Sequence, residues 1–165
     1  MLDAWSQINT SGSKNLLIGA YYRPPSDKRT SLQQLELSLS RINASNTNVI
    51  IGGDLNLGHI DWSIPQVIPG KPETELNIKL LDIIDENNLH QIVNVPTRKE
   101  RILDLILVTN PSNINKVNTL PPLAVLGLVT MMFTQKQTYG CLKYVNNPEK
   151  SLSMTKQTGI TSSLI

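Results

Sequence analysis

One apolar run near the middle of the chain constrains the fold more than any other feature. Residues 48–52 read Asn-Val-Ile-Ile-Gly and show no alternation of apolar and polar side chains. A strand of this kind is buried on both faces, so other elements must cover both sides of the sheet that contains it. Residues 102–108 (ILDLILV) form a second such run, in which Asp104 is the charged residue. The centre of the fold is therefore predicted to be a sheet with buried strands.

Helices and further strands surround these two runs. Apolar residues recur at helical spacing in 31–43 and in 73–88, which predicts two amphipathic helices. Shorter apolar segments that end at proline or turn residues predict strands at 15–22, 91–95 and 115–120. The three prolines of 59–72 favour an irregular loop. This order of elements predicts an α/β (α+β) fold in which helices cover a sheet.

Composition and charge exclude several kinds of protein. The chain has 165 residues, of which 39% are hydrophobic, and this suffices for one domain with a core. Its net charge of +2 is too small to indicate nucleic-acid binding by itself. A single cysteine, Cys141, leaves no internal disulfide partner and excludes a cysteine-cluster zinc site. Because no apolar run could span a bilayer and no signal peptide is visible, we expect an intracellular protein without a membrane partner.

The composition changes sharply along the chain. All arginines, both histidines and all but one of the 13 acidic residues lie before Pro121-Pro122. Beyond these prolines the element pattern degrades: 123–133 is apolar enough for a strand or a helix, and 145–165 has the composition of a flexible tail. This change predicts that two stretches of different origin meet near Pro121-Pro122.

The sequence Gly53-Asp54-Leu55-Asn56 directly follows the first buried run. In α/β sheets the carboxyl end of a strand is the usual place for a ligand. The carboxylate of Asp54 and the amide oxygen of Asn56 could hold a hard divalent cation there, or orient an attacking water and a phosphate. The alternative is an ordinary turn, because Asp and Asn commonly bind their own backbone in turns.

Asp104 is a charge inside an otherwise apolar strand. Burial of a lone carboxylate costs several kcal/mol unless the group is paired or takes part in chemistry. One interpretation makes Asp104 an unpaired member of a site near Asp54, with a raised pKa. The other gives it a structural partner, Arg98 or Arg101, which would lower its pKa.

Two further segments carry groups suited to phosphate. Tyr22 and Arg23 end the first predicted strand, where a phenol could steady an oxyanion and a guanidinium could bind phosphate. Alternatively, Tyr22 is a core aromatic and the following prolines form a turn. Thr97, Arg98 and the cations that follow them could contact a nucleic-acid backbone. Alternatively, these residues form an ordinary solvent-exposed loop without a binding role.

Together these segments resemble a known family. The strings YYRPP (21–25), IIGGDLNLGHIDW (50–62), LLDIIDENNLHQIVNVPTR (80–98) and ILDLILVTNPS (102–112) are similar to the endonuclease domain of non-long-terminal-repeat retrotransposons. That domain belongs to the endonuclease/exonuclease/phosphatase superfamily. The resemblance implies a partial four-layer αββα sandwich and magnesium-dependent cleavage of a DNA phosphodiester. DNA would be the partner, Mg²⁺ the cofactor and the nucleus the location.

The resemblance also implies a role for individual positions. Tyr22 matches the active-site tyrosine near the scissile phosphate, and Thr97 matches a threonine of the loop near the DNA. Asp54 matches the aspartate that orients and deprotonates the attacking water, and Asn56 the asparagine that helps to hold phosphate and metal. Asp104 matches the aspartate that supports the catalytic histidine.

The chain departs from the family pattern at both ends. The family's upstream strand with an asparagine and its helix with the metal-binding glutamate have no counterpart before the first matching strand. Where the family continues with Ser-Asp-His, this chain reads Ala124-Val125-Leu126-Gly127. We therefore expect a partial domain over 1–123 and a divergent, poorly ordered stretch over 124–165, of the kind that a frameshift produces.

Three hypotheses about function follow. The preferred one is a fragment of a metal-dependent DNA endonuclease that is inactive or weakly active, because residues of such a site act as a unit. In the second, another chain or a longer transcript supplies the missing parts. The third is a non-catalytic nucleic-acid-binding or interaction remnant that uses four cations, Arg23, Arg98, Lys99 and Arg101.

Overall fold

The computed structural model describes the chain in six stretches, residues 2–8, 14–42, 47–119, 128–135, 138–145 and 153–157. The chain divides into two compact units, residues 1–111 and residues 112–165. Every predicted site residue lies in the first unit, so the account of the site concerns that unit alone.

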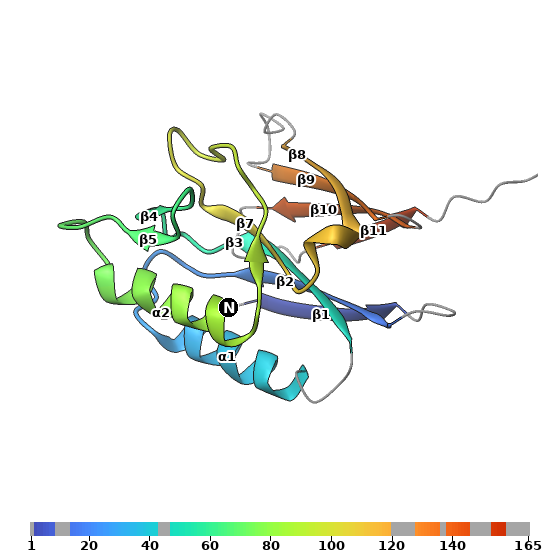
Figure 1. Cartoon of the computed structure of the whole chain (residues 1–165), viewed down its shortest axis with the longest axis horizontal. Helices are drawn as coiled ribbons and strands as arrows, with labels where there is room; N and C mark the ends of the chain where they lie inside the picture. The colour runs from blue at the N-terminus through green and yellow to red at the C-terminus, as the bar shows by residue number, and fades with distance from the viewer. Residues whose placement is uncertain are drawn as a thin grey trace, which may run out of the picture. The chain divides into compact units, whose positions relative to one another are not determined.

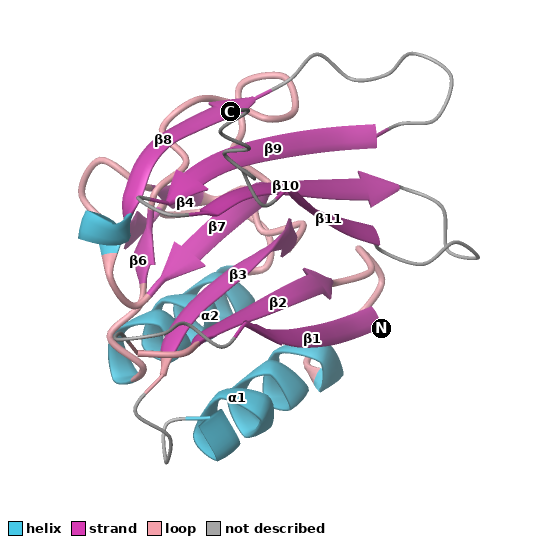
Figure 2. Cartoon of the chain, turned by 90° about the vertical axis from the view of Figure 1, so that its right-hand side faces the viewer, coloured by secondary structure: helices cyan, strands magenta, loops and turns pink. Residues whose placement is uncertain are grey.

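The first unit contains a five-stranded mixed sheet in the order β1-β2-β3-β7-β6 (Figure 1, and Figure 2 for β6). Its strands are β1 Leu2–Ile8, β2 Leu16–Tyr22, β3 Asn48–Asp54, β7 Asp104–Val108 and β6 His90–Gln91. Strands β2 and β3 are parallel, and the other neighbours are antiparallel. The two non-alternating apolar runs thus become β3 and β7, which lie next to each other inside the sheet as their patterns predict.

Two helices pack against one face of this sheet (Figure 2). Helix α1 spans Thr30–Ile42 and connects the parallel strands β2 and β3, and helix α2 spans Thr74–Glu86. Leucine and isoleucine side chains at helical spacing form a buried core with the sheet: Leu32, Leu35 and Leu39 of α1, Leu80, Ile83 and Ile84 of α2, and Ile51, Leu105 and Leu107 of the strands. The mixed sheet with its helices confirms the predicted α+β fold of the endonuclease/exonuclease/phosphatase type.

Several elements differ from the sequence prediction. Strand β1 pairs along its whole length with β2, although its sequence gave no strand signal. The segment 59–72 is not wholly irregular, because β4 Ile60–Asp61 pairs with β5 Gln66–Val67. The strand expected over 91–95 is reduced to β6, and Ile92 adds a backbone hydrogen bond to Ile106 on β7.

The second unit holds a four-stranded antiparallel sheet in the order β11-β10-β9-β8. Its strands are β8 Ile114–Thr119, β9 Leu128–Gln135, β10 Thr138–Val145 and β11 Ser153–Gln157, and the short 3₁₀ helix Pro111–Asn113 precedes β8. The last strand predicted from the sequence corresponds to β8. Strand β11 falls within 145–165, which the composition had predicted to be a flexible tail. Among the described residues, no helix has both the length and the apolar character that crossing a membrane requires.

Candidate active site at three strand ends

Three polar residues line up at the ends of three neighbouring strands. Tyr22 on β2 is in register with Asp54 on β3, and Asp54 is in register with Asp104 on β7. Directly opposite residues of paired strands point to the same face of a sheet. The phenol and the two carboxylates therefore form one row, in which the carboxylates face each other across a strand pair.

This row lies on the sheet face opposite the helices. Side chains alternate between the two faces along a strand. Tyr21 and Leu105, which are the chain neighbours of Tyr22 and Asp104, belong to the buried core that the helices share with the sheet. The predicted catalytic residues thus sit outside that core, at a sheet edge where polar side chains can meet a ligand.

Asp54 is fully buried and is the most constrained residue of the row. Its Oδ1 accepts a hydrogen bond of 2.9 Å from the backbone N–H of Asn56, and its Oδ2 accepts one of 3.2 Å from the guanidinium of Arg98. Burial and the neighbouring Asp104 carboxylate nevertheless raise the pKa of Asp54 to about 6, against the lowering effects of Asn56 and Arg98.

Asp104 is also buried, with 1% of its surface exposed. Burial raises its pKa, against the lowering effects of the Thr97 hydroxyl and of Arg98. Its Oδ2 has no hydrogen-bond partner in the described part of the chain. Of the two interpretations of Asp104, the structure thus favours the incompletely paired carboxylate, since Arg98 forms its ion pair with Asp54.

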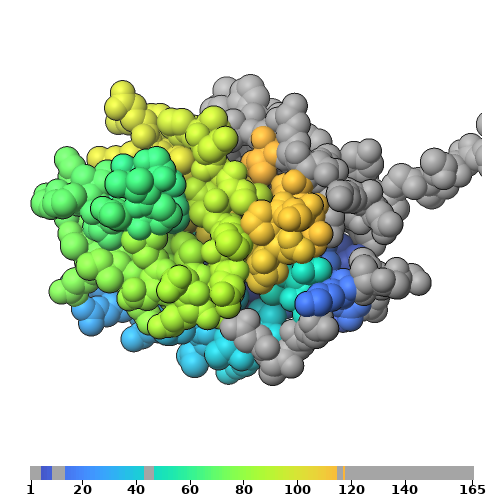
Figure 3. Space-filling model, viewed as in Figure 1, coloured from blue at the N-terminus to red at the C-terminus, as the bar shows by residue number. Residues whose placement is uncertain are grey.

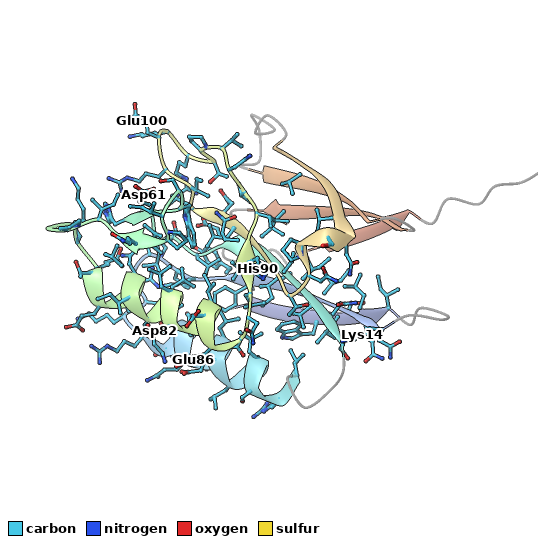
Figure 4. The ribbon with its side chains drawn as sticks, in the orientation of Figure 1. Lys14, Asp61, Asp82, Glu86, His90 and Glu100 are labelled. Carbon is cyan, nitrogen blue, oxygen red and sulfur yellow. The ribbon has the colours of Figure 1, made fainter. Side chains whose placement is uncertain are left out.

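Thr97 and Arg98 reach the row from a tight hairpin over 97–101. Backbone hydrogen bonds join Thr97 and Arg98 to Arg101, and Lys99 at the turn has a positive φ of 53°. Figure 4 shows Glu100 at the outer tip of this loop, far from Asp82 and Glu86 on α2. The hydroxyl oxygen of Thr97 accepts hydrogen bonds from the backbone N–H groups of Leu103 and Asp104. Thr97 therefore fixes the hairpin to the start of β7, and only the side chain of Arg98 extends to Asp54.

Asn56 has a left-handed backbone conformation, with φ 51°. Its amide nitrogen donates a hydrogen bond of 2.9 Å to the carbonyl oxygen of Arg23. Its Oδ1 lies 3.5 Å from the guanidinium of Arg98, which is also bound to Asp54. The predicted turn chemistry of 53–56 is thus present, and the same turn brings the Asn56 oxygen next to the Arg98 guanidinium that binds Asp54.

Arg23 has a different environment from the one expected of a phosphate ligand. Its side chain is fully buried and forms an ion pair of 2.9 Å with Glu73, which precedes helix α2. The same guanidinium donates to the backbone carbonyl oxygens of Asp27, Leu55 and Asn56. In this structure Arg23 therefore braces the turn after β3 against the start of α2, and a contact with substrate remains a prediction. The sequence did not identify Glu73 as the partner of Arg23, because an acidic residue near the start of a helix is common and has no special meaning by itself.

Tyr22 completes the row as a half-buried residue at the end of β2. The N–H of the next residue, Arg23, donates to the carbonyl oxygen of Asp54 at 3.0 Å and extends the parallel pairing of β2 with β3 by one residue. The structure therefore brings Tyr22, Asp54, Asn56, Thr97, Arg98 and Asp104 together, and it places Arg23 beneath them.

A groove with a volume of about 680 Å³ runs beside the hairpin. Its lining comes from the β4–β5 region and from residues 91–102, and includes His59, Trp62, Lys71, Asn94 and Arg101. Figure 3 shows the green surface of the first segment next to the yellow surface of the second. Burial and the nearby cations Arg101 and Lys71 lower the pKa of His59.

The donor set suits a divalent cation only in part. Within the described residues, no group of three or more His, Cys, Asp and Glu side chains is placed to hold a metal ion. The row instead supplies two carboxylates, one with an unpartnered oxygen, and the amide oxygen of Asn56. Mg²⁺ commonly binds through one or two carboxylates and completes its shell with water and substrate phosphate. The residues therefore fit a magnesium ion that substrate helps to hold.

Comparison with known proteins agrees with this geometry. A search of curated proteins and a search of solved structures gave no match. The model of the endonuclease-reverse transcriptase family matches residues 16–124, which is more than half of the chain and contains every residue of the row. The chain belongs to the endonuclease-reverse transcriptase family.

Proposed function

We propose that the strand-end row is the catalytic centre of a divalent-metal-dependent endonuclease that nicks DNA. The observation that carries this proposal is the register of Tyr22, Asp54 and Asp104, which brings a phenol and two buried carboxylates to one sheet edge. Family membership supports the same class of reaction, the hydrolysis of a phosphodiester. Retrotransposon elements would use such a nick at the target site of reverse transcription.

The carboxylate of Asp54 and the Oδ1 of Asn56 would hold the cation, together with the Oδ2 of Asp104, which has no hydrogen-bond partner among the described residues. When bound, Mg²⁺ would neutralise charge on the phosphate and polarise it toward attack. Asp54 would orient a water and accept its proton. The fixed position of Asp54 at the end of β3 suits this task, because positioning alone supplies a large part of such rate enhancement.

Other residues would act on the phosphate. Tyr22 offers a phenol beside Asp54, where it can donate to a phosphate oxygen. The guanidinium of Arg98, which is paired with Asp54 but 43% exposed, matches the geometry of a phosphate group. Thr97 would hold the hairpin in place, and Arg23 would hold the turn that carries Asn56.

We expect the endonuclease activity of this chain on its own to be low. The family resemblance assigns a histidine to Asp104, and the Oδ2 of Asp104 lacks a hydrogen-bond partner in the part of the chain that the structure describes. Loss of one member of a catalytic unit removes most of the rate enhancement. Slow, magnesium-dependent nicking is therefore the expected behaviour.

A supercoiled-plasmid nicking assay tests this function. Asp54→Asn should lower the Mg²⁺-dependent nicking rate by roughly 100-fold or more, as expected for a positioned base. Asp82→Asn is the matched control, because Asp82 is exposed on α2 and lies away from the row. Equal rates for the two variants would exclude Asp54 as a catalytic residue. Robust turnover by the unmodified chain would contradict the expected low activity.

A second function has one observation in its favour. The hairpin exposes three cations, Arg98, Lys99 and Arg101, which could bind a DNA backbone without cleaving it. Binding that weakens steeply with salt, together with no nicking at any Mg²⁺ concentration, would support this non-catalytic role.

A further inference from the structure

Arg98 occupies the position where the proposed cation would bind. One of its terminal nitrogens lies 3.2 Å from the Oδ2 of Asp54, and the other lies 3.5 Å from the Oδ1 of Asn56. These are the two oxygens that the proposed function gives to a divalent cation. The guanidinium and the cation therefore cannot hold both oxygens at the same time.

The hairpin fixes the backbone of Arg98 but not its charged end. The N–H of Arg98 and the carbonyl oxygen of Arg101 are 3.0 Å apart, and the reverse pair has the same distance. The Arg98 side chain is 43% exposed, whereas that of Asp54 is 1% exposed. The long side chain can therefore rotate into solvent while the backbone hydrogen bonds of the hairpin stay in place. Rotamer changes of exposed side chains are fast.

Charge balance favours an exchange of cations. Two carboxyl groups at the row face one guanidinium, and Asp104 keeps an oxygen without a partner among the described residues. Buried charges are stable only when they are well paired. A divalent cation could balance both carboxylates, which Arg98 on Asp54 alone does not.

We propose that Arg98 is a built-in latch, an internal cation that closes the Asp54–Asn56 site and must swing out before a divalent cation binds. The released guanidinium then stands at the rim of the row, where it can bind a phosphate of the substrate. This inference rests on the divalent-cation site of the proposed function. It adds that metal and Arg98 compete in the free protein.

Titration of the full chain with Mn²⁺ in the absence of DNA tests the latch by calorimetry. Arg98→Gln should bind Mn²⁺ about five- to tenfold more tightly than the unmodified chain, because a site blocked by an ion pair for most of the time loses apparent affinity in that proportion. Lys99→Gln is the matched control, since it removes the same charge from the same hairpin, at an exposed position in its turn. Its affinity should change less than twofold.

Arg98→Lys covers the case in which Arg98→Gln does not fold. Lysine keeps the charge but has one terminal nitrogen, so it cannot bind Asp54 and Asn56 in the way that the two terminal nitrogens of arginine do. The gain in Mn²⁺ affinity of Arg98→Lys should therefore be smaller than that of Arg98→Gln. Thermal unfolding gives a second readout: Mn²⁺ should raise the melting temperature of Arg98→Gln more than that of Lys99→Gln.

The outcomes separate the latch from the function. If the Arg98 variants bind Mn²⁺ no more tightly than Lys99→Gln, the latch is refuted; if Asp54→Asn still abolishes Mn²⁺ binding, the proposed metal site stands. If Arg98→Gln binds Mn²⁺ more weakly, Arg98 assists the site and the latch is also refuted. If neither the unmodified chain nor any variant binds Mn²⁺, both the latch and the metal-dependent function fail.

Discussion

Replacement of Asp54 by Asn should stabilise the folded chain at neutral pH. Asp54 is fully buried, and burial together with the facing Asp104 raises its pKa to about 6 from an ordinary value of 3.8. A carboxyl group with a raised pKa in the folded state makes folding less favourable wherever it must ionise. Asparagine has nearly the same shape and carries no charge, so the variant removes this penalty.

The size of the effect follows from the pKa. The rise of the Asp54 pKa from 3.8 to about 6 corresponds to about 3 kcal/mol of unfolding free energy, because one pKa unit is 1.36 kcal/mol. The penalty is absent below the unfolded pKa of 3.8, grows as the pH rises, and is complete above about 6. The stability that Asp54→Asn gains over the unmodified chain should therefore be small at pH 4 and should grow up to pH 7.

Urea unfolding at several pH values between 4 and 7 measures this gain. Asp82→Asn is the control, because it makes the same change of side chain at an exposed position on α2, away from the row. If Asp54→Asn instead loses about 2 kcal/mol or more at pH 7, the ion pair with Arg98 outweighs the burial of the carboxylate, and the reasoning from desolvation is wrong.

Three other substitutions follow from the same contacts. Asp104→Asn removes the facing charge, so the pKa of Asp54 should fall and the chain should be neutral or more stable at pH 7; carbon-13 NMR titration of the carboxyl groups checks this, and an unchanged pKa of Asp54 would contradict it. Arg23→Ala should lower the free energy of unfolding, measured with urea, by about 3 kcal/mol, because it leaves Glu73 and several carbonyl oxygens without their buried donor. The control Arg41→Ala, at an exposed position, should lower it little. Gly53→Ala should lower stability by about 2 kcal/mol or more, since its Cβ would lie 1.7 Å from a backbone carbonyl oxygen of β2; an unchanged melting temperature would refute this contact.

The framework of the fold could be predicted because its signals are local. Runs without alternation mark β3 and β7, and leucines at helical spacing mark α1 and α2. Strand β1 was missed because its sequence, Leu-Asp-Ala-Trp-Ser-Gln-Ile, is not a clear apolar run, and pairing with β2 supplies the order that the sequence does not signal.

The composition of the site was also predictable, but its pairings were not. Asp54, Asn56 and Asp104 are recognisable as polar residues at the ends or starts of buried strands. Which cation pairs with which carboxylate depends on the three-dimensional position of the hairpin, and Arg98 pairs with Asp54. The burial of Arg23 was not predictable either, because helix α1 and strands β3, β4 and β5 separate it in sequence from its partner Glu73.

The cross-strand pair of Asp54 and Asp104 has a consequence for the folding of the chain. In the rest of β3 and β7, local preference and tertiary packing agree, as they do in a minimally frustrated protein. At this pair the apolar neighbours favour strand pairing, while the two like charges oppose it. The conflict arises only when β3 meets β7, two strands that are distant in sequence, and distant contacts are the slow ones in folding. This end of the β3–β7 ladder should then open more readily in the native state than the apolar remainder of the same ladder.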